Sequence, residues 1–311
     1  LPDPVASGRD LLVKIEAVSV NPVDTKIRTR IDPEGNSNVL GWDAAGTVEA
    51  VGDDVTLFQP GDRVWYAGAI DRPGTNSERH VVDERIVAKM PKSLDFAEAA
   101  ALPLTSITAW EMLFDRLALT AESTGTLLII GAAGGVGSIM IQLAKQLTNL
   151  TVIASASREE TATWVNELGA DHVVNHREPL HEELKKIDIH SVNYIAALTE
   201  TETHLPAIIE AIAPQGKIAV IDDPSSFDIM PFKRKSVSVH WEFMFTRSLF
   251  QTDDILEQHR LLTKMSEMVD QGTIRTTATE SLGVINATNI KKAHTLIESG
   301  KARGKIVLAG F

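Results

Sequence analysis

The stretch TLLIIGAAGGVGSIMIQLAKQL, residues 126–147, decides the fold. An apolar run of the length of a buried strand passes through a glycine-rich turn into apolar residues at the three- and four-residue spacing of an amphipathic helix. Such glycines let the backbone approach a ligand closely, and the helix start offers unpaired N–H groups and a positive dipole end. The stretch therefore predicts a pyrophosphate site for a dinucleotide, with a purely structural tight turn as the alternative. Its expected residues are Gly131, Ala133, Gly134, Gly135, Val136 and Gly137.

The segments on either side of this stretch differ in pattern. On the C-terminal side, TVIASA, HVVN, VNYIAAL and GKIAVID are predicted strands, with helices over TATWVNELG and THLPAIIEAIA. That alternation is typical of a parallel sheet wrapped by helices. On the N-terminal side, LLVKIEAVSV, GTVEAVG, DRVWYAG and ERHVVDERIVAKM are predicted strands separated by turn residues. We therefore expect an α/β chain with a β-rich unit and a doubly wound parallel-sheet unit.

Composition limits the partners. The 311 residues, 43% of them hydrophobic, suit one large or two ordinary domains. A net charge of −12 disfavours nucleic acid or an anionic membrane as a partner. The absence of cysteine excludes disulfides, thiol nucleophiles and zinc sites built on thiolates. With no long apolar run and no signal-peptide pattern, a cytoplasmic protein is expected, unless a targeting segment was trimmed.

The residues that discriminate between NAD and NADP lie about 20 residues after the glycine turn, where NAD-binding proteins carry an acidic residue. Here the segment is IASASREE, which offers Ser155, Ser157 and Arg158. Hydroxyls and a guanidinium suit a ribose 2′-phosphate, so NADP(H) is the expected cofactor. Glu159 and Glu160 argue in the other direction, and Arg158 has the alternative role of a solvated residue at a helix start.

Several motifs together resemble the medium-chain dehydrogenase/reductase superfamily. They are NPVD (21–24), LGWDAAGTVEAVG, FQPGDRV, LPLTSITAWE, IIGAAGGVGS and LGADHVVNH, and the match is to the quinone oxidoreductase-like branch and its zinc-type alcohol dehydrogenase-like members. The resemblance implies a GroES-like catalytic domain (1–108), a Rossmann NADP(H)-binding domain (109–275) and a return to the catalytic domain (276–311).

The chain departs from the zinc-dependent members of this superfamily at their ligands. The resemblance places Asn21, Trp42 and an alanine of AEAAAL where those enzymes carry ligands for catalytic zinc. Tryptophan cannot ligate a metal and asparagine is a poor zinc ligand. Most of the nine histidines are interpreted as surface or capping residues. No zinc is therefore expected, and Asp43 is interpreted as a structural hydrogen-bonding residue.

Without a Lewis acid, the favoured acceptors are those that delocalise the charge left by hydride transfer. We expect NADPH-dependent, zinc-independent reduction of a quinone or an α,β-unsaturated carbonyl. An NADPH-binding structural or sensory protein with little turnover remains an alternative, and a zinc-dependent alcohol dehydrogenase is a disfavoured one.

The resemblance also suggests individual site residues. Asn21 and Asp24 are expected near the nicotinamide, with an Asx-Pro turn as the alternative. Trp42 is expected as a wall of the active site, and Tyr66 as a hydrogen-bond donor to the substrate or an interface residue. Further cofactor contacts are expected from Thr105, Thr108, His176, Leu198, Thr199, Ile221, Asp222, Trp241 and Phe243.

The aromatic-rich segment at residues 236–252 suggests an oligomer. The alternation of Trp241, Phe243 and Phe245 predicts that they share one face of a strand. In the superfamily this region extends the sheet across a dimer, so a homodimer is expected. Ordinary core packing is the alternative.

Overall fold

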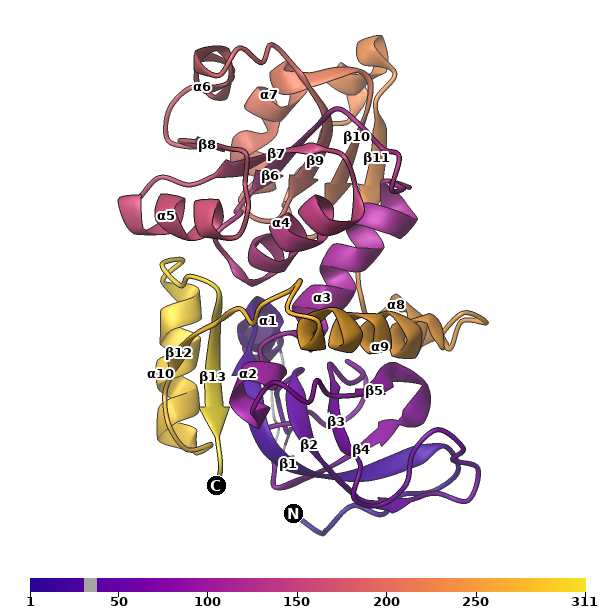
Figure 1. The fold of residues 1–311 in the computed structure, drawn as a ribbon. Helices are drawn as coiled ribbons and strands as arrows, with labels where there is room; N and C mark the ends of the chain where they lie inside the picture. Colours follow the sequence, from indigo (N-terminus) through magenta and orange to yellow (C-terminus); the bar gives the residue numbers. More distant parts are fainter. Residues whose placement is uncertain (31–37) are drawn as a thin grey trace. The chain divides into compact units, whose positions relative to one another are not determined.

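The computed structural model describes residues 1–30 and 38–311. Contacts divide the chain into two units (Figure 1): unit 1 comprises Leu1–Ile107 and Met244–Phe311, and unit 2 comprises Thr108–Phe243. The second boundary lies earlier than the expected position at 275. Helix α9 (Glu257–Asp270) packs against β5 (Val87–Lys89), which groups this helix with unit 1.

Unit 1 is built on a sheet that, over the described residues, has seven strands in the order β12-β13-β1-β2-β3-β5, with β4 pairing β1. Besides β5 and α9, its elements are β1 (Asp10–Val20), α1 (Pro22–Arg30), β2 (Ala44–Val51), β3 (Arg63–Tyr66), β4 (Arg79–Asp83), η1 (Glu84–Ile86), α2 (Phe96–Ala100), α8 (Thr246–Phe250), β12 (Ala278–Ser281), α10 (Ala287–Glu298) and β13 (Lys305–Ala309). The antiparallel pairing of β1 with β13 puts Val20 opposite Ile306. It therefore places the start of β13, near the C-terminus, beside Asn21, the residue that follows β1.

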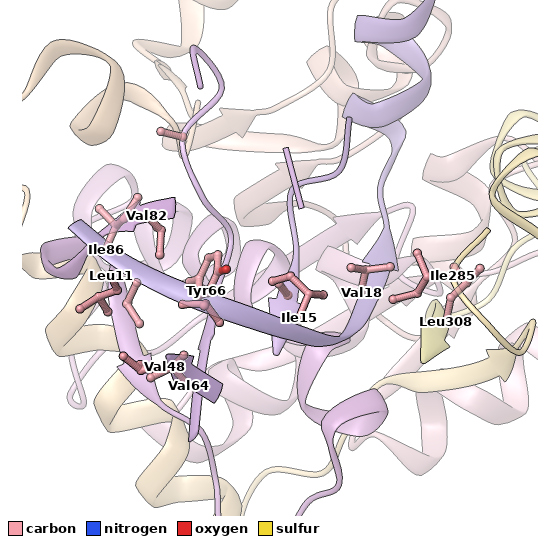
Figure 2. Close-up of a cluster of buried hydrophobic side chains, with 14 of the residues drawn as sticks. Leu11, Ile15, Val18, Val48, Val64, Tyr66, Val82, Ile86, Ile285 and Leu308 are labelled. Carbon is pink, nitrogen blue, oxygen red and sulfur yellow. The ribbon is translucent and has the colours of Figure 1, made fainter. Parts of the chain in front are cut away.

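The core of unit 1 consists of side chains that the strands of this sheet bring together. Figure 2 shows side chains of β1, β2, β3 and β4 gathered on one cluster, which also receives Ile285 and Leu308 from the C-terminal segment. The alternation of buried residues along β1, with Leu11, Val13 and Ile15 each at most 1% exposed, is the period-two pattern of a strand. The C-terminal residues are thus part of the same core.

Unit 2 is a six-stranded parallel sheet in the order β11-β10-β9-β6-β7-β8, and all of its residues are described. Its elements are η2 (Glu111–Arg116), β6 (Thr126–Ile130), α4 (Gly135–Leu147), β7 (Thr151–Ser155), α5 (Glu159–Glu167), β8 (His172–Val174), α6 (Leu180–Lys186), β9 (Val192–Ala197), α7 (Thr201–Ala211), β10 (Ile212–Val220), η3 (Met230–Lys235) and β11 (Ser238–Trp241). Helix α3 (Pro103–Trp110) crosses the boundary between the units.

This strand order reverses direction between β6 and β9, as in a Rossmann fold. Right-handed crossovers then place α4 and α5 on one face of the sheet and α6 and α7 on the other, and α6 packs against α7. The predicted doubly wound parallel sheet is confirmed.

Three details differ from the sequence expectations. The segment ERHVVDERIVAKM forms two strands, β4 and β5, because η1 interrupts it. The residues after Asn21 form helix α1 rather than a simple turn. The predicted shared face of Trp241, Phe243 and Phe245 is wrong: β11 ends at Trp241, next to the end of its partner β10, and Phe245 is 2% exposed whereas Trp241 is 55% exposed. Within the described parts of the chain, no helix is long and apolar enough to cross a membrane.

Candidate functional site

The glycine turn of unit 2 has the backbone that a phosphate-binding loop requires. Gly131 follows β6 with a φ of +80°, a backbone conformation that residues other than glycine rarely adopt. A Cβ atom on Gly131 would lie 2.8 Å from Thr199 Cγ2, and one on Gly137 would lie 2.4 Å from the Ala132 carbonyl oxygen. The first glycine therefore permits the turn and the other permits close packing of α4. Gly134 occupies the N-cap of α4 and brings no side chain to it, so a ligand can approach the N–H groups of the first turn.

Ser155 supports the glycine turn. Its hydroxyl accepts a hydrogen bond from the Gly131 N–H at 3.0 Å, and the residue is 2% exposed. This contact stabilises the glycine turn and leaves the hydroxyl proton to be donated, so the expected contact of Ser155 with the cofactor stays a prediction. Ser157 and Arg158 follow β7 and are half-buried, while Glu159 and Glu160 are exposed at the start of α5.

The expected residues after β9 and β10 lie at the same edge of the sheet as the glycine turn. The Leu198 N–H donates to the Ile130 carbonyl at 3.2 Å, and Gly131 approaches Thr199 as described above. Ile221 follows β10, and its N–H donates to Ala197. The Asp222 carboxylate accepts from the N–H of Thr201 at 2.8 Å and from its hydroxyl, so it caps α7.

The other expected cofactor residues are distributed more widely. Thr105 and Thr108 are both buried on α3, where the Thr105 hydroxyl donates to the Leu102 carbonyl at 3.1 Å. Trp241 and Phe243, at the end of the edge strand β11, are 55% and 46% exposed. Their assignment as cofactor contacts stays a prediction.

In unit 1, a buried polar network surrounds Asp43, which is 0% exposed. Asp43 Oδ2 accepts from Ser19 Oγ and Asn21 Nδ2, each at 2.8 Å, and from Lys305 Nζ at 3.1 Å. Asp43 Oδ1 accepts from the Leu104 N–H at 2.8 Å. Burial raises the pKa of the Asp43 carboxyl, and these donors act in the opposite direction. The expected structural, hydrogen-bonding role of Asp43 matches this geometry.

Lys305 was not identified from the sequence, although it closes this network. Its ammonium group donates to the Val20 carbonyl, to Asn21 Oδ1 and to Asp43 Oδ2, and the residue is 3% exposed. A lysine at the start of the apolar run KIVLAG was the available signal, because an isolated cation in a core strand needs a buried partner.

Asn21 and Asp24 belong to the same buried region. Asn21 uses its amide fully: Oδ1 accepts from Lys305, and Nδ2 donates to Asp43 and, at 3.3 Å, to the Trp42 carbonyl. Asp24 Oδ2 accepts from the Asn21 N–H at 2.7 Å. Burial raises the pKa of Asp24 to about 7, so this carboxyl changes its charge near neutral pH.

Trp42 is buried, and its only side-chain N–H already donates a hydrogen bond. The indole Nε1–H donates to the Ala69 carbonyl at 3.1 Å, and the ring meets Phe245 edge to face with centroids 6.4 Å apart. Since Trp42 is 3% exposed, its ring contributes apolar packing.

Tyr66 lies in the core that Figure 2 shows, and its hydroxyl has a partner within the unit. Tyr66 Oη lies 3.0 Å from His80 Nδ1, and His80 Nε2 lies 2.8 Å from the Pro73 carbonyl oxygen. The tautomer that satisfies both contacts donates from Nε2 to Pro73 and accepts from Tyr66 at Nδ1. Burial lowers the pKa of His80 to about 4, so this imidazole is neutral at pH 7. The hydroxyl proton of Tyr66, which was expected to be donated to a substrate, is thus directed at His80. His80 was not identified from the sequence.

Comparisons with known proteins agree with both units. Residues 7–92 match the family model of the alcohol dehydrogenase GroES-like domain, and residues 168–308 match that of zinc-binding dehydrogenases. A zinc-type alcohol dehydrogenase-like protein of Staphylococcus epidermidis is 41% identical over 310 residues, which cover 98% of this chain and 92% of that protein. The chain belongs to the medium-chain dehydrogenase/reductase superfamily. It is therefore an oxidoreductase of this type, with a GroES-like domain and a Rossmann domain.

Two solved structures of superfamily relatives have the same fold. A Rhizobium etli protein, named provisionally as a zinc-dependent alcohol dehydrogenase, has 56% identity and a TM-score of 0.96, covering 100% of this chain and 92% of its own. A quinone oxidoreductase of Pseudomonas syringae has 26% identity and a TM-score of 0.85, covering 99% of this chain and 94% of its own.

The zinc in these names does not fit the residues of this superfamily member. The sequence holds no cysteine, and the Trp42 indole is a donor that cannot ligate a metal. Asn21 Oδ1, the one oxygen at that position suited to a metal, accepts from the Lys305 ammonium instead. Among residues 1–30 and 38–311, no three histidine, aspartate or glutamate side chains are grouped so as to hold a metal ion.

Proposed function

We propose that the chain is an NADPH-dependent reductase of quinones or α,β-unsaturated carbonyls that works without zinc. The observation that carries the proposal is Trp42, a buried indole with its N–H donated to Ala69. The sequence resemblance places it where the zinc-dependent members carry a ligand. The glycine turn of unit 2 supports a dinucleotide cofactor, with its positive-φ Gly131 and the N-cap Gly134, which brings no side chain.

The acceptor class follows from where negative charge goes in the reaction. NADPH, when bound, supplies a hydride. Hydride addition to an isolated ketone leaves full charge on one oxygen, which zinc would stabilise by several kcal/mol. An enone or quinone spreads that charge through its own conjugated system, so one hydrogen-bond donor or a water is enough at the oxygen. The quinone oxidoreductase of P. syringae supports this class by its name.

The preference for NADPH over NADH rests on Ser157 and Arg158. They follow β7, at the edge where the ribose of a dinucleotide is bound in this fold. A guanidinium attracts a 2′-phosphate, and no carboxylate occupies the three positions that end with Arg158. Glu159 and Glu160 are exposed on the first turn of α5.

The test is NADPH oxidation by the purified protein, measured against panels of quinones, enones and simple ketones. Metal-free protein, prepared by exhaustive chelation and checked for residual zinc, is compared with untreated protein and with NADH as donor. Equal quinone or enone reduction before and after chelation supports the proposal. Activity lost on chelation and restored by zinc would overturn the metal-free mechanism, and tight NADPH binding without turnover would favour a sensory or structural role.

We also propose that the protein is a homodimer formed through the edge strand β11. Among the described residues this strand pairs only with β10, and Trp241 at its end and Phe243 just after it are 55% and 46% exposed. A second copy would pair with the free edge and cover these rings. Light scattering at micromolar concentration tests the proposal, and a monomer there would contradict it.

A further inference from the structure

Three oxygen atoms of unit 1 surround the ammonium group of Lys305, and we call them the oxygen cage. They are the Val20 carbonyl oxygen at 3.0 Å, Asp43 Oδ2 at 3.1 Å and Asn21 Oδ1. A lysine ammonium group has three N–H donors, so the cage offers one acceptor for each of them. The register of β1 against β13 puts Ile306 opposite Val20 and therefore holds Lys305 beside these oxygens.

The oxygen cage is closed to solvent and carries a negative charge when Asp43 is ionised. Val20, Asn21, Asp43 and Lys305 are each at most 3% exposed. An isolated carboxylate is costly to bury unless an opposite charge and hydrogen-bond donors accompany it. Burial raises the pKa of both Asp43 and Asp24, and the charge of Lys305 acts in the opposite direction on both. An ionised Asp43 thus requires a cation inside the cage.

The distances in the oxygen cage indicate which kind of cation fits. The separations of 3.0 Å and 3.1 Å from Nζ lie within the range of about 2.7–3.2 Å for N–H···O hydrogen bonds. Oxygen ligands lie about 2.0–2.2 Å from zinc, about 2.0–2.1 Å from magnesium and about 2.3–2.6 Å from calcium. The cage is therefore wider than these metal ions require, and its size matches an ammonium group.

We propose that the oxygen cage is a binding site for a primary ammonium group, and that Lys305 is the cation built into it. By engaging Asn21 Oδ1 and Asp43 Oδ2, the lysine keeps metal ions away from the position where the sequence resemblance places a zinc ligand. The inference goes beyond the proposed function, because it holds for any acceptor or cofactor. The cage should keep its selectivity for an ammonium group that is no longer attached to the chain.

The variant Lys305→Ala separates the cation from the chain. It keeps Cβ and removes a fragment that corresponds to n-propylammonium. Hydrogen exchange of peptides from β1 and β13 is measured in n-propylammonium chloride and, at the same ionic strength, in tetramethylammonium chloride, a cation without N–H groups. Magnesium chloride and zinc chloride test metal ions, and 1-propanol tests the filling of space without charge. Lys292→Ala, at an exposed position of α10 in the same unit, is the matched control.

We expect n-propylammonium to raise the protection of β1 and β13 in Lys305→Ala, by about tenfold at roughly ten times its dissociation constant. If Lys305→Ala is unfolded in buffer alone, n-propylammonium should restore its folded state, as followed by circular dichroism. The other additives should change the protection little, and the parent protein and Lys292→Ala should respond to none of them. Adding Asp43→Asn to Lys305→Ala removes the buried carboxylate and should abolish the response to n-propylammonium.

Three outcomes would overturn the inference. They are a Lys305→Ala protein that n-propylammonium neither protects nor folds, an equal response to 1-propanol, and a stronger response to magnesium or zinc than to n-propylammonium. Reductive methylation of the parent protein, analysed by mass spectrometry, adds a measurement that needs no variant. Lys305 should react far more slowly than the exposed Lys292, and equal rates would contradict its place in the cage. None of these measurements involves NADPH oxidation, so the proposed function is tested separately.

Discussion

Replacing Lys305 by methionine should destabilise unit 1 by about 4 kcal/mol. The side chain is 3% exposed and its ammonium group donates to Val20, Asn21 and Asp43. Removing one partner of a buried ion pair costs roughly 3–5 kcal/mol, because the other charge stays buried without its counter-charge. Methionine keeps the apolar packing of the stem, and Asp43 keeps the donors Ser19, Asn21 and Leu104. The expected loss therefore lies inside that range.

Hydrogen exchange resolved by peptide provides the assay, because the two units report separately. Peptides from β1 and β13 report on unit 1, and peptides from β6 and α4 in unit 2 serve as an internal control. A loss of about 4 kcal/mol corresponds to exchange roughly a thousandfold faster in the protected amides of β1 and β13. The protection of β6 and α4 should change little.

The double variant Lys305→Met with Asp43→Asn separates charge from packing. Since it removes both charges, it should recover a substantial part of the stability lost in Lys305→Met alone. A change in β1 and β13 protection of less than about 1 kcal/mol in Lys305→Met would refute the reasoning. It would show that Asp43 is not an ionised group that depends on Lys305.

Three further predictions concern single groups. Asp24 has a pKa raised by burial from 3.8 to about 7, so its protonated form favours folding below about pH 4 and this advantage is lost as pH rises through 7. In urea unfolding, the free energy of unfolding of Asp24→Asn relative to that of the parent should rise by up to about 4 kcal/mol between pH 4 and pH 8. Parallel pH profiles of the two proteins would contradict this. Tyr66→Phe should lower the unfolding free energy by about 1–3 kcal/mol by leaving His80 without its donor, whereas a fall in kcat/KM at unchanged stability would identify Tyr66 as a substrate donor. Gly131→Ala should weaken NADPH binding at least tenfold because of its positive φ and close contact, while Gly272→Ala, equally left-handed but with open space around its Cβ, should bind NADPH normally.

The parts of the fold that sequence reasoning predicted are those encoded locally. The glycine turn, the strand before it and the helix after it occupy 22 consecutive residues, 126–147. They can therefore be predicted from adjacent residues, and the parallel sheet around them from the alternation of strands and helices. The positive φ of Gly131 is of this kind.

The features that the sequence left hidden depend on distant pairing. Lys305 reaches Asn21 across 284 positions of sequence, and only the register of β1 against β13 brings them together. His80 on β4 contacts Tyr66 on β3, and the two residues are 14 positions apart in the sequence. The end of β11 at Trp241 is set by the length of β10, which the aromatic pattern of residues 236–252 does not contain. In each case, the partner rather than the residue itself decides the role.

The pair Trp42–Asp43 connects these observations with the proposed chemistry. The Trp42 N–H is donated to Ala69, and both oxygens of Asp43 accept hydrogen bonds. Asn21 likewise has its amide engaged on both sides. None of these three groups therefore offers a free proton to stabilise an oxyanion in the way a metal would. An acceptor that delocalises its own charge makes the smallest demand on such a core, which is the reason to test quinones and enones before simple ketones.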